Sequence, residues 1–323
     1  MSIKINKDNI EFNNYTMTFT EEGFVFDGEI LANSISITPP MAGTVAGYTS
    51  GGYAPPNTNV IDKFPFATDA NATDVGDLTQ ARRIVAGQSS SENGYTSGGD
   101  APPIVNTIDK FPFATDANAT DVGDLTQGRY RAAGQSSNEN GYTSGGYVPA
   151  RNTIDKFPFA TDANATDVGD LTQARRNVVG QSSAENGYSS GGFVPTTDII
   201  DKFPFATDAN ATDVGDLTVG RYGAAGQSSN ENGYTSGGLG PPTFNTIDKF
   251  PFATDTNATD VGDLTQTRRY VTGQSSSENG YSSGGNAPGI VNTIDKFPFA
   301  TDANATDVGD LTQVRAGTAG QQD

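Results

Sequence analysis

The sequence predicts an all-β fold in which one four-stranded unit is repeated six times, and two observations lead to this prediction. The first is a repeat: the segment IDKFPFATDANATDVGDLT recurs at intervals of 46 or 47 residues, with a single substitution, Thr256 for alanine, in six copies. The copies begin at Ile61, Ile108, Ile154, Ile200, Ile247 and Ile294. The second is that short apolar or aromatic runs alternate with turn-forming residues, without helical spacing of useful length.

The first two expected strands of each unit differ in their side chains. Segments such as VAGQSS contain only small residues apart from one glutamine, which suits a strand crowded against its neighbours at an axis. The segment GYTSGG or GYSSGG that follows has an aromatic residue and ends in two glycines. Glycine permits a positive φ or a bulge where the chain must turn.

The other two expected strands lie within the invariant segment. Because side chains alternate along a strand, Ile61 and Lys63 are expected on one side and Phe64 and Phe66 on the other. Apolar groups on both faces indicate a strand packed between two neighbours. The segment TDANAT supplies turn residues, and DVGDLT is expected to form a short outer strand whose aspartates discourage edge pairing.

The two ends of the repeat region complement each other. The first unit starts near Ala46 without a small-residue strand, and the final RAGTAGQQD supplies one. Four-stranded units of this length repeated radially are typical of β-propellers. We therefore expect residues 46–323 to form a six-bladed β-propeller, closed by pairing of residues 316–321 with residues 47–50. The alternative is a solenoid, which requires distinct capping repeats.

The order of residues within each unit resembles the kelch repeat. An aromatic strand ending in Gly-Gly (Tyr48, Gly51, Gly52) is followed by a strand with a buried aromatic residue, Phe64, and by a Leu-x-x-x-Arg step from Leu78 to Arg82. The outer-strand tryptophan of the kelch family is absent, so the resemblance is to a divergent form. It implies a propeller. Kelch-type oxidases bind copper through histidine and a modified cysteine, and this sequence contains neither.

Residues 1–45 share nothing with the repeat. IKINKDNIEF, TMTFTEE, FVFDGEIL and SISIT alternate apolar and polar residues, which predicts short strands with one buried face. So few residues cannot build a large core alone. We expect a docking or oligomerisation segment, joined to the propeller through residues 34–43; packing against the side of the propeller is the alternative. The layout resembles the fibres of tailed bacteriophages, in which the N-terminus docks on the virion.

Composition excludes several function classes. With 38 acidic against 19 basic residues, the net charge of −19 argues against nucleic acid as a partner. No apolar stretch is long enough for membrane insertion, and the opening residues lack the apolar region of an export signal. The absence of histidine and cysteine removes the usual metal ligands and nucleophile pairs. We expect no cofactor, no metal and no enzymatic activity.

The six copies differ from one another in two stretches only. One follows the Gly-Gly pair and the other follows Leu-Thr, and in a propeller both lie on one face of the disc. Variable loops on a fixed scaffold are typical of a recognition surface; relaxed constraint on loops is the alternative, and it predicts variation on both faces. The candidate binding residues are Tyr53, Asp100, Tyr147, Arg151, Phe193, Leu239, Asn286, Arg83, Tyr130, Arg131, Arg176, Tyr222, Arg269 and Tyr270.

Other recurring residues have plainer explanations. Arg82 and its equivalents occur in every unit, which favours a structural salt bridge or carbonyl contact between blades. The aspartates and asparagine of TDANATDVGD superficially resemble a calcium loop, but the sixth position lacks the required glycine. Asn-Ala-Thr is a glycosylation sequon in each copy. A carboxylate pair of the glycosidase type would require a unique constellation, and these acidic residues recur six times.

The sequence therefore predicts a non-enzymatic recognition head on the outside of a virion. This head is expected to bind a host surface glycan or protein through one loop face. Residues 1–45 are expected to contact other virion proteins, and a homo-oligomer is expected. The alternatives are a structural decoration or assembly protein of a virion and a cellular kelch-type interaction scaffold.

Overall fold

The computed structural model divides the chain into two compact units, residues 1–39 and 40–323. It describes residues 3–5, 9–12, 15–20, 23–26, 29–32 and 43–323. The unit boundary lies a few residues before the one expected from the sequence, since residues 43–45 already hydrogen-bond within the second unit, to Ser275 and Asp323. The expected strand SISIT and most of the expected junction lie outside the described residues.

The first unit contains a five-stranded antiparallel sheet in which each strand pairs with the next along the chain. Its strands are β1 (Ile3–Ile5), β2 (Asn9–Phe12), β3 (Tyr15–Thr20), β4 (Gly23–Phe26) and β5 (Glu29–Ala32). The alternating segments at the N-terminus thus form strands as predicted, and their order is a simple meander.

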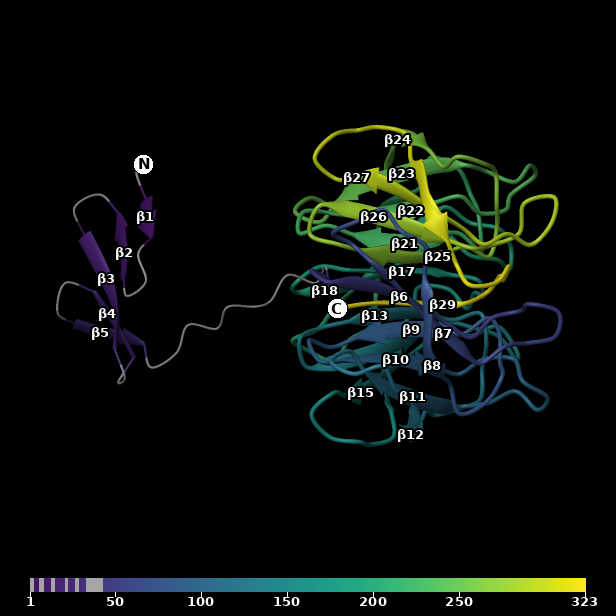
Figure 1. Ribbon diagram of the computed structural model, residues 1–323, viewed down its shortest axis with the longest axis horizontal. Helices are drawn as coiled ribbons and strands as arrows, with labels where there is room; N and C mark the ends of the chain where they lie inside the picture. The colour runs from purple at the N-terminus through teal and green to yellow at the C-terminus, as the bar shows by residue number, and fades with distance from the viewer. Residues whose placement is uncertain (1–2, 6–8, 13–14, 21–22, 27–28, 33–42) are drawn as a thin grey trace. The chain divides into compact units, whose positions relative to one another are not determined.

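The second unit is a six-bladed β-propeller of four-stranded antiparallel blades, as the sequence predicts. The innermost strands contact one another in a closed cycle around the axis, and Figure 1 shows their labels along the middle of this unit. They are β9 (Ala86–Ser89), β13 (Ala133–Ser136), β17 (Val179–Ser182), β21 (Ala225–Ser228), β25 (Thr272–Ser275) and β29 (Ala319–Gln322).

Three further strands complete each blade outward from the axis. The second strands are β6 (Ala46–Ser50), β10 (Asn93–Ser97), β14 (Asn140–Ser144), β18 (Asn186–Ser190), β22 (Asn232–Ser236) and β26 (Asn279–Ser283). The third are β7 (Val60–Pro65), β11 (Thr107–Pro112), β15 (Thr153–Pro158), β19 (Ile199–Pro204), β23 (Thr246–Pro251) and β27 (Thr293–Pro298). The fourth are β8 (Thr73–Asp77), β12 (Thr120–Asp124), β16 (Thr166–Asp170), β20 (Thr212–Asp216), β24 (Thr259–Asp263) and β28 (Thr306–Asp310).

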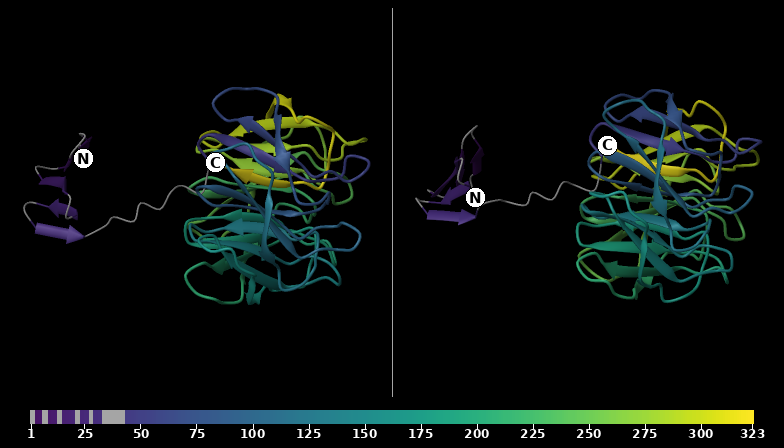
Figure 2. Two further views of the ribbon diagram at one scale, coloured as in Figure 1. Left: turned by 60° about the horizontal axis from the view of Figure 1, so that its bottom comes forward. Right: turned by 90° about the horizontal axis from the view of Figure 1, so that it is seen from below.

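The C-terminal strand closes the ring. Strand β29 pairs antiparallel with β6, with Ala319 opposite Ser50 and Gln322 opposite Gly47, and Ala316 forms a separate bridge with Tyr53. In Figure 2 the yellow C-terminal strand lies beside the blue-purple strands of the first blade. The expected closure is confirmed, with the paired strand at residues 319–322 rather than 316–321. The first blade (β29, β6, β7 and β8) therefore contains both ends of the propeller sequence.

Apolar layers lie between blades rather than in one central core. Tyr95, Ile108 and Leu125 of the second blade pack against Phe157 and Ala165 of the third, and the other blade interfaces repeat this arrangement. The third strand therefore buries side chains on both faces, as its alternation predicts. The tyrosine of each second strand stacks on a phenylalanine of the next blade, with ring centroids 4.8 to 4.9 Å apart.

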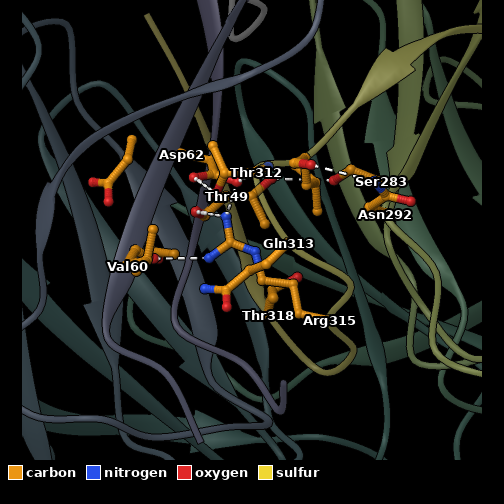
Figure 3. A network of polar contacts seen from close by, with 12 residues as sticks. Thr49, Val60, Asp62, Ser283, Asn292, Thr312, Gln313, Arg315 and Thr318 are labelled. Atoms are coloured by element: carbon orange, nitrogen blue, oxygen red, sulfur yellow. Dashed lines mark hydrogen bonds and ion pairs between the residues drawn. The ribbon is translucent and has the colours of Figure 1, made fainter. Parts of the chain in front are cut away.

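A buried ion pair also lies at each blade junction, which confirms the structural role expected for the recurring arginines. Each arginine of the Leu-x-x-x-Arg step reaches an aspartate on the third strand of the following blade, and both side chains are at most 1% exposed. Figure 3 shows the pair that joins the last blade to the first, Arg315 and Asp62. The Asp62 carboxylate also accepts hydrogen bonds from the backbone N–H and the hydroxyl of Thr312, and Arg315 donates to the Val60 carbonyl at 2.9 Å.

The loops that hardly vary lie together on one face, here called the constant face, where the backbone N–H of Phe113 donates to the carbonyl of Glu92. They also make hydrogen bonds and ion pairs with neighbouring blades. Asn118 accepts a hydrogen bond from the backbone N–H of Asp77 in the preceding blade, and Lys110 pairs with Asp162 of the next blade. The following blade thus covers part of the edge of each outer strand. The aspartates of that strand protect the edge further, because their charges discourage pairing with another strand.

Candidate functional site

The two variable stretches meet on the face opposite the constant face, here called the variable face. Just after each Gly-Gly pair, one residue forms an isolated antiparallel bridge with a residue of the crossover that enters the same blade. The six bridges are Tyr53 with Ala316, Asp100 with Arg83, Tyr147 with Tyr130, Phe193 with Arg176, Leu239 with Tyr222, and Asn286 with Arg269. These contacts use backbone N–H and C=O groups, so side chains at these positions vary without loss of the bridge.

A ring of six residues surrounds the axis on this face and is here called the axial ring: Ile84, Arg131, Asn177, Gly223, Tyr270 and Gly317. Each backbone N–H donates to the carbonyl of its counterpart in the preceding blade, at 2.5 to 3.1 Å, and the six bonds close on themselves. All six residues have φ between 54° and 65°. Residues other than glycine rarely adopt this conformation and keep it only where the surroundings impose it. The hydrogen-bonded cycle provides that constraint.

A groove of about 260 Å³ opens beside the axial ring and is here called the variable-face groove. Seven candidate residues line it, together with Ile84, Ile290, Ala316 and Gly317. The seven are Tyr53, Arg83, Asp100, Tyr130, Arg131, Tyr270 and Asn286. They come from the first, second, third and sixth blades, so residues up to 233 positions apart in the chain contribute to one cavity.

Of the two arginines in the groove, only Arg83 is paired with a carboxylate within the described residues. Arg83 and Asp100 form an ion pair at 2.9 Å, and the Arg83 guanidinium also lies 5.1 Å from the centre of the Tyr53 ring. Arg131 lies over the Tyr130 ring at 5.3 Å. Its Nε is buried without a hydrogen-bond partner, and Arg131 has no carboxylate partner within the described part of the chain. The groove therefore presents one uncompensated guanidinium among tyrosine rings.

A second group of candidates forms a stacked row next to the groove, here called the arginine–aromatic arc and consisting of Tyr147, Arg176, Phe193 and Tyr222. The Arg176 guanidinium lies 4.4 Å from the ring centre of Tyr147 and 4.9 Å from that of Phe193. Phe193 in turn meets Tyr222 at 5.0 Å. Tyr147 also contacts Tyr130 edge-to-face at 5.7 Å, which connects the arc to the groove.

Three candidates lie outside both groups. Arg151 donates to the carbonyl of Val148 in its own loop, and Leu239 contributes its backbone bridge to Tyr222. Arg269 lines a separate cavity of about 320 Å³ together with Asn286. All fourteen candidates are half-buried in the structure, because the bridges hold the variable stretches against the blades.

Only two of the six axial-ring residues are identified as candidates from the sequence, although the sequence contains a signal for all six. This column of the repeat reads Ile, Arg, Asn, Gly, Tyr and Gly, and it varies at nearly every copy. Only Arg131 and Tyr270 were picked out, for their residue types. The ring itself depends on hydrogen bonds between successive blades, which local sequence does not display.

Charge is distributed unequally over the propeller. Apart from the six buried arginines, the two variable stretches contain five arginines (Arg83, Arg131, Arg151, Arg176 and Arg269) and two acidic residues, Asp100 and Asp198. The lysines of the third strands are paired with aspartates. The two variable stretches thus have an excess of positive charge on a chain whose net charge is −19.

The acidic repeat has a structural explanation. Asp69 pairs with Lys296, Asn71 accepts a hydrogen bond from the backbone of Asp310, and Asp74 accepts one from Gly76. These contacts account for residues that superficially resemble a calcium loop. Within the described ranges, no three acidic side chains are grouped so as to hold a metal ion.

No protein-family model and no curated protein sequence matches this chain. Within the described residues there is no helix long and apolar enough to cross a membrane.

Proposed function

We propose that this protein is a non-enzymatic recognition head whose variable face binds a partner on a host cell surface. The observation that supports this most directly is that the positions that vary between blades are also those where aromatic and arginine side chains cluster. Sequence variation among otherwise near-identical blades is concentrated on one face, where tyrosine, phenylalanine and arginine side chains form a groove and a stacked arc. These residue types dominate binding energy at interfaces.

The setting we favour is a bacteriophage virion, with the propeller as the outer part of a fibre or surface appendage and the kelch-like repeat as a divergent scaffold. In this proposal the N-terminal sheet docks on other virion proteins or on copies of itself. Several heads on one particle would strengthen weak individual binding through avidity. The mass of the full-length protein in solution tests self-association: a monomer would argue against it.

The binding proposal is tested with the full-length protein and intact candidate host bacteria. We expect a groove variant, Tyr53→Ala with Tyr130→Ala, or an arc variant, Tyr147→Ala with Arg176→Ala, to lose most cell binding, because each removes two large contact side chains. Thr161→Ala, at an exposed position of the constant face, is the matched control. If every variant binds as the unmodified protein does, a structural role in assembly is favoured instead.

A further inference from the structure

We propose that the variable-face groove binds the carboxylate of an acidic sugar unit, with Arg131 as the residue that receives it. This rests on the proposed recognition function and specifies its ligand class. A carboxylate is the natural partner of a guanidinium, since the planar fork of arginine donates two parallel hydrogen bonds to its oxygens.

Arg131 differs from the other arginine of the groove in having no anionic partner. Arg83 already pairs with Asp100 at 2.9 Å. The Nε of Arg131 is buried and lacks a hydrogen-bond partner. No carboxylate of the described residues compensates this guanidinium, and a carboxylate ligand in the groove would do so. The position of Arg131 is also constrained, because its backbone is held at φ 65° within the axial ring.

A second unpartnered donor lies close by on the same ring. Asn177 is 5% exposed and its Nδ2 is buried without a hydrogen-bond partner. The backbone N–H of Asn177 donates to the carbonyl of Arg131 at 2.7 Å. Both residues line a cavity along the propeller axis, here called the central channel, which is bounded by the innermost strands and the axial ring. Arg131 lines both the central channel and the groove, so the two cavities share this residue.

The size and lining of the groove favour a sugar over a protein segment. About 260 Å³ lies just below the ~300–1,000 Å³ typical of small-molecule pockets, whereas a stable protein interface covers ~800 Å² on each partner. Tyr53, Tyr130 and Tyr270 offer flat rings with polar tips, which contact the apolar face of a sugar ring while their hydroxyls hydrogen-bond. Asn286 adds an amide that both donates and accepts.

The distribution of charge on the protein also favours an anionic ligand. The chain as a whole is strongly acidic, so an anionic ligand is repelled from most of its surface and attracted only where arginines exceed acidic residues. That excess lies in the two variable stretches, which include Arg131 of the groove. Binding is therefore expected to weaken as ionic strength rises, because exposed charges are screened by salt.

The test uses the full-length protein on immobilised polygalacturonate, alginate and hyaluronate, each beside its carboxyl-reduced neutral form. We expect at least one acidic form to bind about tenfold or more tightly than its reduced counterpart, the factor expected from loss of a charge-assisted hydrogen bond. Arg131→Gln should lose the same factor. Lys156→Gln, which makes the same charge change at a third-strand lysine paired with Asp208 of the constant face, should retain binding. Thermal unfolding of both variants confirms that they are folded.

Three outcomes would overturn the inference: no binding to any of the three acids, equal binding to acidic and reduced forms, or equal loss in Arg131→Gln and Lys156→Gln. The last would show attraction to positive charge in general. Failure of the proposed function looks different, because the groove and arc variants would then bind host bacteria as well as the unmodified protein does. Loss of cell binding in those variants without binding to the acids would refute only the ligand class.

Discussion

Adjacent arginines in the crossovers have different physical roles. Arg175 is 1% exposed; it pairs with Asp201 at 2.9 Å and donates to the Ser189 carbonyl. Burial lowers the pKa of Arg175, and the negative charge of Asp201 opposes this shift. Arg176, the next residue, is half-buried and stacks on aromatic rings of the variable face. The arginine at the Arg175 position holds two blades together, so it recurs in every copy. The residue at the Arg176 position makes contacts that the ring does not require, so it varies.

This contrast predicts different effects on stability. Arg175→Leu should lower the free energy of unfolding by ~3–5 kcal/mol, because it leaves the Asp201 carboxylate buried without its cation. Arg176→Leu should cost about 1 kcal/mol or less, the range of a cation–π contact near the surface. Urea unfolding followed by circular dichroism measures both. A similar loss in the two variants would contradict the assignment of the buried pair as the structural one.

At the scale of single elements, the innermost strands are limited by how closely they approach each other. A Cβ built on Gly134 of β13 would lie 2.1 Å from the backbone oxygen of Gly87 in β9, and the equivalent glycines meet their neighbours at 2.0 to 2.2 Å. Only glycine fits at this position, which explains why the glycine of the inner strand recurs in all six copies while the preceding crossover varies.

We therefore expect Gly134→Ala to destabilise the propeller by at least ~1–3 kcal/mol, the usual cost of overpacking, since the obstacle is backbone rather than a movable side chain. Gly289→Ala is the matched control, because a Cβ there would meet no atom within 4 Å. That variant should be neutral or slightly stabilising, since alanine has less conformational freedom in the unfolded chain. Thermal unfolding of the two proteins decides: an equal effect would show that the close approach of the strands is relaxed easily.

At the scale of the whole molecule, the ring depends on its last strand. Gln321 in β29 donates to Ser50 of β6 and to the Tyr95 carbonyl and Thr96 hydroxyl in the next blade. The carbonyl of Asp323 accepts hydrogen bonds from residues 44–46. The terminal strand thus joins the first, second and last blades at once, since it also packs against β25.

Deleting residues 319–323 should lower the melting temperature by about 10 °C or more, as expected when several kcal/mol are lost from a domain of this size. It should also enlarge the hydrodynamic radius, because the first blade loses its inner strand. Gln322→Ser, which restores the sequence of the other inner strands, should leave both quantities close to those of the unmodified protein. A truncated protein with unchanged size and melting temperature would show that the ring stays closed without β29.

The sequence alone determined the architecture, because each blade carries the same local information. The 46- or 47-residue period, the two glycines after each aromatic strand and the unmatched strands at the two ends together specified six blades and their closure. The recurrence of Arg82 and its equivalents also indicated a contact between blades. Near-identical repeats make these inferences mutually supporting, since every copy tests the same assignment.

The tertiary structure decided which variable residues meet. Tyr53, Arg131 and Tyr270 belong to different repeats, and they line one groove only because the ring brings the sixth blade back beside the first. The positive φ values of the axial ring arise in the same way, from hydrogen bonds between successive blades that close around the axis. A repeat specifies the shape of each blade and its contact with the next, but the chemistry of a face depends on differences between copies, and those combine only once the ring has closed.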